Sequence, residues 1–448
     1  MGGFLKGYAR FSPFFAVIAT FQGNPMRIYN LFPLLAGPVT QWGPHLERAA
    51  DLGFDWIFVN PIQKPGKSGS LYSIRDYFRI NPALIDRTVT ASGNAQVRKM
   101  VARAEKLGLR MMQDLVINHC AYDSPLLKKH PEWFVHEGGK VAHPHCLEDG
   151  QKVVWRDLAL FDHRQGSDPE GLYQYCRKVV DHLIGLGFKG FRCDAAYQIP
   201  SRFWQRLIGE VRQDHPEVVF VAETLGCSPD LTRETASAGF DYIFNSSKWW
   251  DFSSPWLLEQ YDLTRETAPS ISFPESHDTP RLYAETQGNI DAMKQRYLFS
   301  ALFSAGVMMP MGFEFGFEKP LHVVATTPSD WEQPKVDLCD FIRHLNRIKS
   351  RYPVFREESA TLLLDHPNPA IMMLWKGSTR TNQEALLILN KNVWQPEHFY
   401  LEDLYRYVQS SPLRDVSPEW PLDYLPTPFQ FDLAPGMGRI LVTRADGG

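Results

Sequence analysis

Basic runs, long apolar stretches and repeats are all missing from this sequence of 448 residues. No cluster of lysine or arginine is long enough to follow a phosphate backbone, and the formal net charge is −4, so we expect no nucleic-acid partner. No apolar run is long enough to cross a bilayer, and we expect no membrane association. The sequence is 44% apolar and 22% charged, which, together with its length, is typical of a globular protein with at least two domains. Composition leaves the oligomeric state open.

Cysteine is scarce and scattered. The six cysteines form no C-x-x-C pair and no dense framework in a small domain. Reduced thiols in the cytoplasm are therefore the simpler interpretation, and we expect a cytoplasmic location.

The N-terminal segment 1–26 roughly imitates a signal peptide. Lys6 and Arg10 precede the apolar run FSPFFAVIATF. Against that interpretation, Pro13 interrupts the run and no small-x-small cleavage site follows it. We expect a helix docked on the rest of the protein, with a signal peptide as the alternative.

Short apolar or β-branched runs recur eight times with amphipathic stretches between them. This alternation over about 300 residues predicts an α/β fold, the (β/α)8 TIM barrel, whose strands are buried on both sides. A doubly wound open sheet is the alternative, but no glycine-rich phosphate turn follows the first run. The predicted strands are 27–37, 55–62, 110–119, 188–196, 218–225, 240–247, 270–278 and 306–317.

The predicted strands divide the chain into parts. We expect the barrel to span 27–119 and 166–358. Between these parts, residues 120–165 are polar, rich in histidine and poorly periodic, and a loop of that length predicts a functional segment or a small subdomain. From 359 to 448 the chain consists of short β-like runs separated by Pro, Asn and Gly, which predicts a C-terminal β-sandwich domain.

Polar residues follow the predicted strands at the end where a barrel carries its chemistry. The run GFKGFRCDAA, for example, ends in Arg192 and Asp194, which are costly to bury without partners or a task. Each such residue alone could be a helix cap, a surface pair or an ordinary hydrogen-bonding group. Together they would hold like charges close to one another, which favours a functional site. The candidates are Asp114, Asn118, His119, Arg192, Asp194, Glu223, His277 and Asp278.

Two carboxyl groups on one rim suit the cleavage of a glycosidic bond, in which one protonates the leaving oxygen and the other attacks the anomeric carbon. Asp194 fits the attacking group, because Arg192 lies two residues earlier on the same side of the strand and supplies a counter-charge. Glu223 emerges from the apolar run VVFVA and fits the proton donor. Asp278 would then stabilise the positive charge that develops on the sugar.

Ordered motifs give the chain a family resemblance. Four of them resemble, in order, the four sequence regions of the α-amylase family, glycoside hydrolase family 13: DLVINH, GFRCDAA, VAETLG and ESHDTP. The segments LGFDWIFVNPI and LYSIRDYFRINP are similar to the second-strand segment of that family. The resemblance covers roughly 27–320. It implies a (β/α)8 barrel, a B subdomain at 120–165, a C-terminal β domain and an enzyme that retains configuration at an α-glucosidic carbon.

The family's site residues can be matched to this chain one by one. The resemblance makes Asp194 the nucleophile, Glu223 the acid/base and Asp278 the transition-state stabiliser. It also implies an α-glucan or α-linked oligosaccharide as substrate. Arg192 matches the arginine that orients the nucleophile, and Tyr72 matches the tyrosine that stacks on the sugar. We count five residues as substrate-binding: Tyr72, Asp114, His119, Arg192 and His277.

Within the family, RIYNLFPLLAG and HPEWF are similar to the α-glucan:maltose-1-phosphate maltosyltransferases. In those enzymes an asparagine that serves the donor phosphate typically follows the nucleophile, whereas this chain has Ala195. Many amylases place Lys-His three and four residues after the nucleophile, whereas this chain has Tyr197 and Gln198. Ser276 also replaces the usual asparagine of the fourth motif. Acceptor binding is therefore expected to differ, and transfer of a maltosyl or glucosyl unit stays open beside hydrolysis.

We expect no cofactor and no transition metal. Asn118 stands where calcium-binding amylases have a ligand, so calcium stays an alternative, although the partner carboxylates cannot be identified in 120–165. His143 and His145 lie in a loop without a fixed partner and are interpreted as solvent-exposed. The aromatic residues Trp249, Trp250, Phe252 and Trp256 form either a sugar-stacking platform at the barrel mouth or core packing.

Two other classes of function are weaker. A non-catalytic relative acting as a binding subunit should lack one of the carboxylates, and this chain has all three. A metal-dependent barrel hydrolase would need His-x-His at the end of the first strand, where the chain has Asn30, Leu31 and Phe32.

Overall fold

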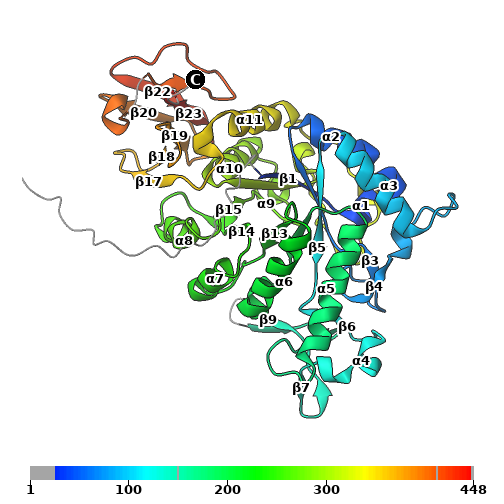
Figure 1. Cartoon of the computed structure of the whole chain (residues 1–448). Helices are drawn as coiled ribbons and strands as arrows, with labels where there is room; N and C mark the ends of the chain where they lie inside the picture. The colour runs from blue at the N-terminus through cyan, green and yellow to red at the C-terminus, as the bar shows by residue number, and fades with distance from the viewer. Residues whose placement is uncertain (1–25, 149–150, 410–411, 445–448) are drawn as a thin grey trace, which may run out of the picture.

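The computed structural model describes residues 26–148, 151–409 and 412–444. Its central feature is a closed parallel barrel, which confirms the predicted (β/α)8 architecture (Figure 1). Each of the eight predicted strand segments contributes one barrel strand, although the strands are shorter than expected. In barrel order these are β1 (Met26–Leu31), β2 (Trp56–Val59), β5 (Arg110–Leu115), β12 (Gly190–Cys193), β13 (Val219–Ala222), β14 (Tyr242–Phe244), β15 (Ser270–Ser272) and β16 (Gly306–Pro310).

Amphipathic helices cover the outside of the barrel (Figure 1). Several begin at a side-chain cap, since Ser92, Asp168, Ser228 and Asn289 each accept a hydrogen bond from a backbone N–H of the first turn. The longer helices are α2 (Gly43–Asp51), α3 (Gly93–Lys106), α5 (Pro169–Gly185), α6 (Ser201–Asp214), α7 (Pro229–Ala236), α8 (Trp256–Thr264), α10 (Ile290–Phe303) and α11 (Cys339–Arg351). Short helices are α1 (Pro33–Ala36), α4 (Leu126–Lys129) and α9 (Leu282–Glu285). No helix of the described ranges is long and apolar enough to cross a membrane.

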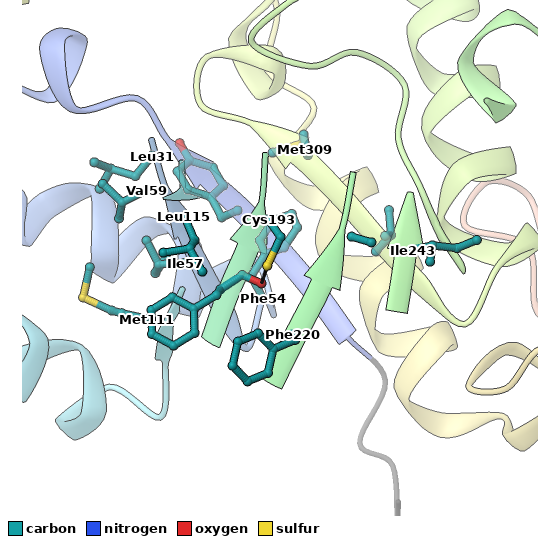
Figure 2. Close-up of a cluster of buried hydrophobic side chains, with 14 of the residues drawn as sticks. Leu31, Phe54, Ile57, Val59, Met111, Leu115, Cys193, Phe220, Ile243 and Met309 are labelled. Carbon is teal, nitrogen blue, oxygen red and sulfur yellow. Dashed lines mark hydrogen bonds between the residues drawn. The ribbon is translucent and has the colours of Figure 1, made fainter. Parts of the chain in front are cut away.

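Side chains alternate between two apolar layers along the barrel strands. One layer fills the barrel and includes Ile28, Phe58, Met112 and Val221. The intervening positions point to the helices, and the residues labelled in Figure 2 belong to that outer layer. Because this alternation has a period of two, any residue two positions beyond an interior residue faces the barrel axis.

The excursion that leaves the barrel after β5 is built from short strands. It contains β6 (His119–Ala121), β7 (His136–Glu137), β8 (Lys140–Val141), β9 (His145–Glu148), β10 (Gln151–Val154) and β11 (Leu158–Leu160). The prediction that the third barrel strand runs to His119 is wrong, because β5 ends at Leu115 and His119 begins β6, which pairs with β11. A separate hairpin of β3 (Gln63–Pro65) and β4 (Ile74–Ile80) follows β2.

The C-terminal part contains two sheets. A five-stranded sheet has the order β17, β18, β19, β23, β21, and a two-stranded sheet pairs β20 with β22. Apolar residues of both sheets form one cluster, as expected for a β-sandwich. The part lies beside α10 and α11 (Figure 1), and Nε2 of Gln295 on α10 donates to the carbonyl of Asn390 at 2.7 Å. The bounds are β17 (Ala360–Leu364), β18 (Ile371–Gly377), β19 (Glu384–Asn390), β20 (Glu397–Leu401), β21 (Arg414–Asp415), β22 (Phe429–Leu433) and β23 (Gly438–Val442).

The expected N-terminal docked helix falls in 1–25, outside the described residues. The described chain begins with Met26, the first residue of β1.

Candidate active site

The alternation of the barrel strands places the predicted charged residues at one end of the barrel axis. Asp114 lies two positions beyond the interior residue Met112, and Glu223 lies two positions beyond Val221. Arg192 and Asp194 follow the interior position Gly190 in the same way. These polar residues, the polar rim, therefore form the next layers of the barrel interior, beyond the apolar layers and at the carboxyl ends of the strands.

Arg192 is the centre of this rim. Its side chain is buried, and its Nη1 donates to both carboxylate oxygens of Asp114, at 3.0 and 3.1 Å. The same Nη1 lies 2.6 Å from Oδ1 of Asp194, and Nη2 lies 3.6 Å from Oε2 of Glu223. Burial opposes the charge of the guanidinium, but the three carboxylates outweigh it and raise the pKa of Arg192. One cation thus holds three carboxyl groups from neighbouring strands in a common position.

The surroundings of Glu223 favour its protonated form. Burial and then the negative charge of Asp194 raise its pKa to about 7, against the opposing effect of Arg192. Its Oε2 accepts a hydrogen bond of 2.7 Å from the backbone N–H of Ala195, which has the left-handed φ of 43°. Because Oε2 is occupied as an acceptor, the transferable proton belongs on Oε1. Burial also raises the pKa of Asp114, to about 6.

Tyr72 connects Asp114 with the loop that follows β15. Its hydroxyl donates to Oδ2 of Asp114 at 2.7 Å and lies 2.6 Å from Nε2 of His277. The same Nε2 lies 3.0 Å from Oδ2 of Asp278, whose side chain is 61% exposed. Partial desolvation opposes the charge of Asp278, but His277 and the more distant Arg192 outweigh it and lower the pKa of Asp278. The polar network thus runs from Asp194 to Asp278 without a break.

His119 completes the set of predicted residues, and Asp194 and the backbone of Tyr72 lie close enough to it to oppose the effect of burial on its pKa. Its ring is buried, and neither ring nitrogen has a hydrogen-bond partner among the described residues. The Nδ1 of His277 is likewise unpaired within the described part of the chain. Burial lowers the pKa of His119, which favours the neutral ring. A buried polar atom without a partner costs about 1–3 kcal/mol, so these nitrogens are suited to receive groups of a ligand.

Two buried asparagines at the site were missed by the sequence analysis. Nδ2 of Asn60, which follows β2, donates to the Tyr72 hydroxyl at 3.0 Å. Nδ2 of Asn30, on β1, donates to Oδ1 of Asn60 at 2.9 Å. Both occupy interior positions two residues beyond Ile28 and Phe58. The period-two pattern of the strands was the signal that could have revealed them.

Three residues that the sequence links to metal binding, Asn118, His143 and His145, can be located in the structure. The side-chain amide of Asn118 donates to Oε1 of Gln198 at 2.8 Å. The expectation that His143 is solvent-exposed without a fixed partner is wrong, because it is half-buried and its Nδ1 lies 2.7 Å from the carbonyl of Leu158, whereas His145 is exposed. The described residues contain no group of three or more His, Cys, Asp or Glu side chains that could hold a metal ion. Calcium therefore stays an untested alternative, and no chemical step is assigned to it.

The aromatic cluster after β14 has two parts with different environments. Trp250 and Phe252 are buried and pack against Phe299 of α10, with ring centroids 5.2 and 5.0 Å away. Trp249 is 52% exposed and meets the edge of Phe273, which lies in the barrel interior. Trp256 is partly buried against the core. Core packing is thus correct for Trp250 and Phe252, and Trp249 remains available for a ligand.

A known family model matches the first part of the barrel. Residues 20–137 match the glucanotransferase domain of glycogen debranching enzyme. This range includes β1, β2, β5 and the loop that carries Tyr72.

Curated relatives match over most of the chain. An α-1,4-glucan:maltose-1-phosphate maltosyltransferase of Burkholderia pseudomallei is 25% identical over 377 residues, which cover 81% of this chain and 32% of that protein. The protein of the same name from Arcanobacterium haemolyticum is 28% identical over 321 residues, 64% of this chain and 45% of that protein. The chain therefore spans less than half the length of either relative.

Solved structures share the fold over nearly the whole chain. The maltogenic α-amylase AmyB of Thermotoga neapolitana has a TM-score of 0.73 at 19% identity, covering 93% of this chain and 98% of that one. The α-amylase of H. orenii has a TM-score of 0.75 at 15% identity, covering 94% of this chain and all of the other. At such identities these structures show the fold alone. The sequence matches and the ordered motifs support a relationship of the chain to the α-amylase family.

Proposed function

We propose that the protein is a retaining enzyme that acts on α-glucans or α-linked oligosaccharides and hydrolyses or transfers glycosyl units. One observation carries the proposal: a single buried arginine holds Asp194 and Glu223 together, and Glu223 has a pKa of about 7 while its Oε2, not its Oε1, accepts the hydrogen bond from Ala195. A carboxylate nucleophile beside a protonated carboxylic acid is the pair that double displacement at a glycosidic bond requires.

The first chemical step would use both groups at once. Glu223 donates the proton on Oε1 to the glycosidic oxygen as the bond to the anomeric carbon breaks. Asp194 attacks that carbon and forms a glycosyl ester, while Arg192 and the Ala195 N–H keep the two carboxyl groups in place. Asp278, a carboxylate exposed at the mouth, would balance the charge on the oxocarbenium-like sugar.

The second step would reverse the proton transfer. Glu223, now ionised, removes a proton from water or from a sugar hydroxyl, and that oxygen attacks the anomeric carbon and releases Asp194. The unpaired nitrogens of His119 and His277 supply hydrogen-bonding positions for the hydroxyls of the bound sugar.

Transfer of a maltosyl or glucosyl unit is the second candidate, because the matched relatives are named maltosyltransferases. In this chain Ala195 follows the proposed nucleophile, and its short apolar side chain offers no hydrogen bond to a donor phosphate. A glycosidic donor is therefore favoured over a sugar phosphate.

Product analysis tests the proposal and separates the two candidates. The protein is incubated with maltose, maltooligosaccharides, sucrose, trehalose and maltose 1-phosphate, with and without a glucan acceptor, and products are resolved by length. Free sugars without chain elongation indicate hydrolysis, and elongated chains indicate transfer. The absence of any product with the α-linked donors, under conditions in which the protein is folded, would contradict the proposal.

A cytoplasmic location remains part of the proposal. It rests on the scattered distribution of the six cysteines, which is typical of a reducing compartment.

A further inference from the structure

A chain of buried hydrogen bonds leads from the backbone of β2 to the exposed carboxylate at the barrel mouth. We propose that Asn60 is a positioning residue: it holds the Tyr72 hydroxyl between Asp114 and His277, where the donation of the hydroxyl proton to Asp114 fixes a proton on Nε2 of His277. That proton faces Asp278. The inference rests on the role proposed above for Asp278 and explains how that carboxylate would be held.

The orientation of the two asparagine amides follows from a backbone carbonyl. The carbonyl of Phe58 can accept a hydrogen bond but cannot donate one, and Nδ2 of Asn30 lies 3.1 Å from it. The amide nitrogen of Asn30 must therefore occupy this side, and it also donates to Oδ1 of Asn60 at 2.9 Å. Asn60 is consequently turned with its own nitrogen toward Tyr72. Both amides are fully buried, so no solvent competes for these bonds.

The charge of Asp114 then decides where the hydroxyl proton of Tyr72 goes. It accepts from Asn60 at 3.0 Å, and an ionised Asp114 at 2.7 Å can only accept. The single hydroxyl proton of Tyr72 is therefore donated to Asp114. The third contact, Nε2 of His277 at 2.6 Å, must be the donor in its own bond to the hydroxyl oxygen.

This order of donors and acceptors places a proton on Nε2 of His277, whether the ring is neutral or charged. Nε2 carries the proton and shares it between the Tyr72 oxygen and Oδ2 of Asp278, which lies 3.0 Å away. With the proton on Nδ1 instead, a bare nitrogen lone pair would face both oxygens and repel them. Asn60 thus acts on Asp278 through two intermediaries and does not contact it directly.

The position of the ring proton can be measured without any substrate. In protein labelled with ¹⁵N at histidine, long-range ¹H–¹⁵N correlations distinguish a ring protonated on Nε2 from one protonated on Nδ1. The signals of His277 are assigned by their loss in His277→Gln. We expect an Nε2 proton in the free protein between about pH 7 and 9, above the pKa of Asp114, and a ring protonated on Nδ1 alone would overturn the inference. Because no turnover is needed, this result is independent of the proposed activity.

Two substitutions test Asn60 itself. In Asn60→Asp, the protonated carboxyl can donate to Tyr72 as the amide does, but the ionised carboxyl, which also faces Asp114 and His277 beyond Tyr72, cannot. Burial at this position raises the pKa of the new carboxyl, so kcat should show an added decline of about tenfold as pH rises, with KM nearly unchanged. In Asn60→Leu the donor is absent at every pH. Here kcat should fall about tenfold throughout, and the Nε2 proton should exchange with water at least about tenfold faster.

Asn346 offers a matched control. It is fully buried on α11, accepts from the hydroxyl of Tyr297 at 2.9 Å and donates to the carbonyl of Leu52 at 2.9 Å. Asn346→Asp makes the same chemical change beside another tyrosine but should leave the wild-type pH profile. Equal profiles for the two aspartate variants would overturn the role of Asn60, as would wild-type kcat and proton exchange in Asn60→Leu. If Asn60→Asp does not fold, Asn60→Leu decides.

Discussion

Buried charges gather at both ends of the barrel, and the two groups differ in how completely they are paired. The lower end is the one at which the barrel strands begin. There, Nζ of Lys349 donates to three backbone carbonyls, at 2.6 to 2.9 Å. Nearby, Nζ of Lys376 donates to the carbonyl of Phe303 at 2.6 Å, and Glu358 accepts from backbone N–H groups of Ser270 and Ala305.

The upper end, where the strands end and the proposed active site lies, contains buried nitrogen atoms without a hydrogen-bond partner in the described part of the chain. Both ring nitrogens of His119 and Nδ1 of His277 have no partner within the described residues, and Asp278 is largely exposed. Burial shifts the pKa of groups at both ends, lowering that of Lys376 to about 8 and raising that of Glu223 to about 7. A shifted pKa therefore does not separate a structural cluster from a functional one. These two clusters differ instead in that Nζ of Lys349 is fully paired, whereas both ring nitrogens of His119 and Nδ1 of His277 have no partner within the described residues.

Removing the proposed nucleophile at the upper end should give the largest loss of activity. Asp194→Asn keeps the size of the side chain but removes the carboxylate, so kcat should fall about ten-thousandfold or more on any true substrate. The midpoint of thermal unfolding should change little, because Arg192 keeps Asp114 and Glu223 as partners. Wild-type turnover in the variant would remove Asp194 from the mechanism.

The proposed acid should show a smaller loss that depends on the substrate. Glu223→Gln cannot donate a proton, and kcat should fall about a thousandfold on a natural glucoside. Substrates whose leaving group needs no protonation, such as a glycosyl fluoride, should recover much of that rate. Equal losses on both kinds of substrate would argue against the acid role.

At the lower end, Lys349→Met should affect stability and leave chemistry unchanged. The substitution removes the side-chain nitrogen and leaves the carbonyls of Ala301, Ser304 and Phe355 without their donor, which should lower the free energy of unfolding by about 3 kcal/mol. Urea unfolding measures this loss, and kcat per folded molecule should equal that of the wild type. A fall in kcat with unchanged stability would show that the lower cluster is functional.

The sequence predicted the upper end far better than the lower one. Asp194 and Glu223 follow short apolar runs, so the strand pattern and the position at the strand end indicated a shared rim. Lys349, by contrast, lies in a helix with alternating charged and apolar residues, a pattern typical of a solvent-exposed face. Its burial depends on carbonyls at the end of α10 and after α11, which meet only in the folded chain.

The asparagine pair shows a second limit of prediction from sequence. Asn30 and Asn60 are 30 residues apart and meet because Asn30 pairs with Phe58 in the parallel register of β1 and β2. A single amide at a strand end is compatible with a turn or a cap, so the individual residues carry little information. Strand order and register were needed to reveal the pair.

The pH dependence of activity should follow Glu223. Burial and Asp194 raise its pKa to about 7, and the first step requires the protonated form. As pH rises above about 7 the protonated fraction falls, so kcat/KM should decline about tenfold for each further pH unit. Glu223→Gln, which cannot titrate, should lose this alkaline limb in its residual activity. A wild-type profile that is flat up to pH 9 would be incompatible with the assignment.

The smallest expected effect separates two adjacent tryptophans after β14. Trp249 is 52% exposed near the barrel mouth, whereas Trp250 is buried and donates through Nε1 to the carbonyl of Ser254 at 2.7 Å. If Trp249 stacks on a bound sugar, Trp249→Ala should raise KM about fivefold, equivalent to about 1 kcal/mol, with unchanged unfolding. Trp250→Ala should instead cost about 3–5 kcal/mol of stability, because it empties a packed site beside Phe299. An unchanged KM in Trp249→Ala would leave the exposed ring without a ligand role and confine substrate contacts to the polar rim.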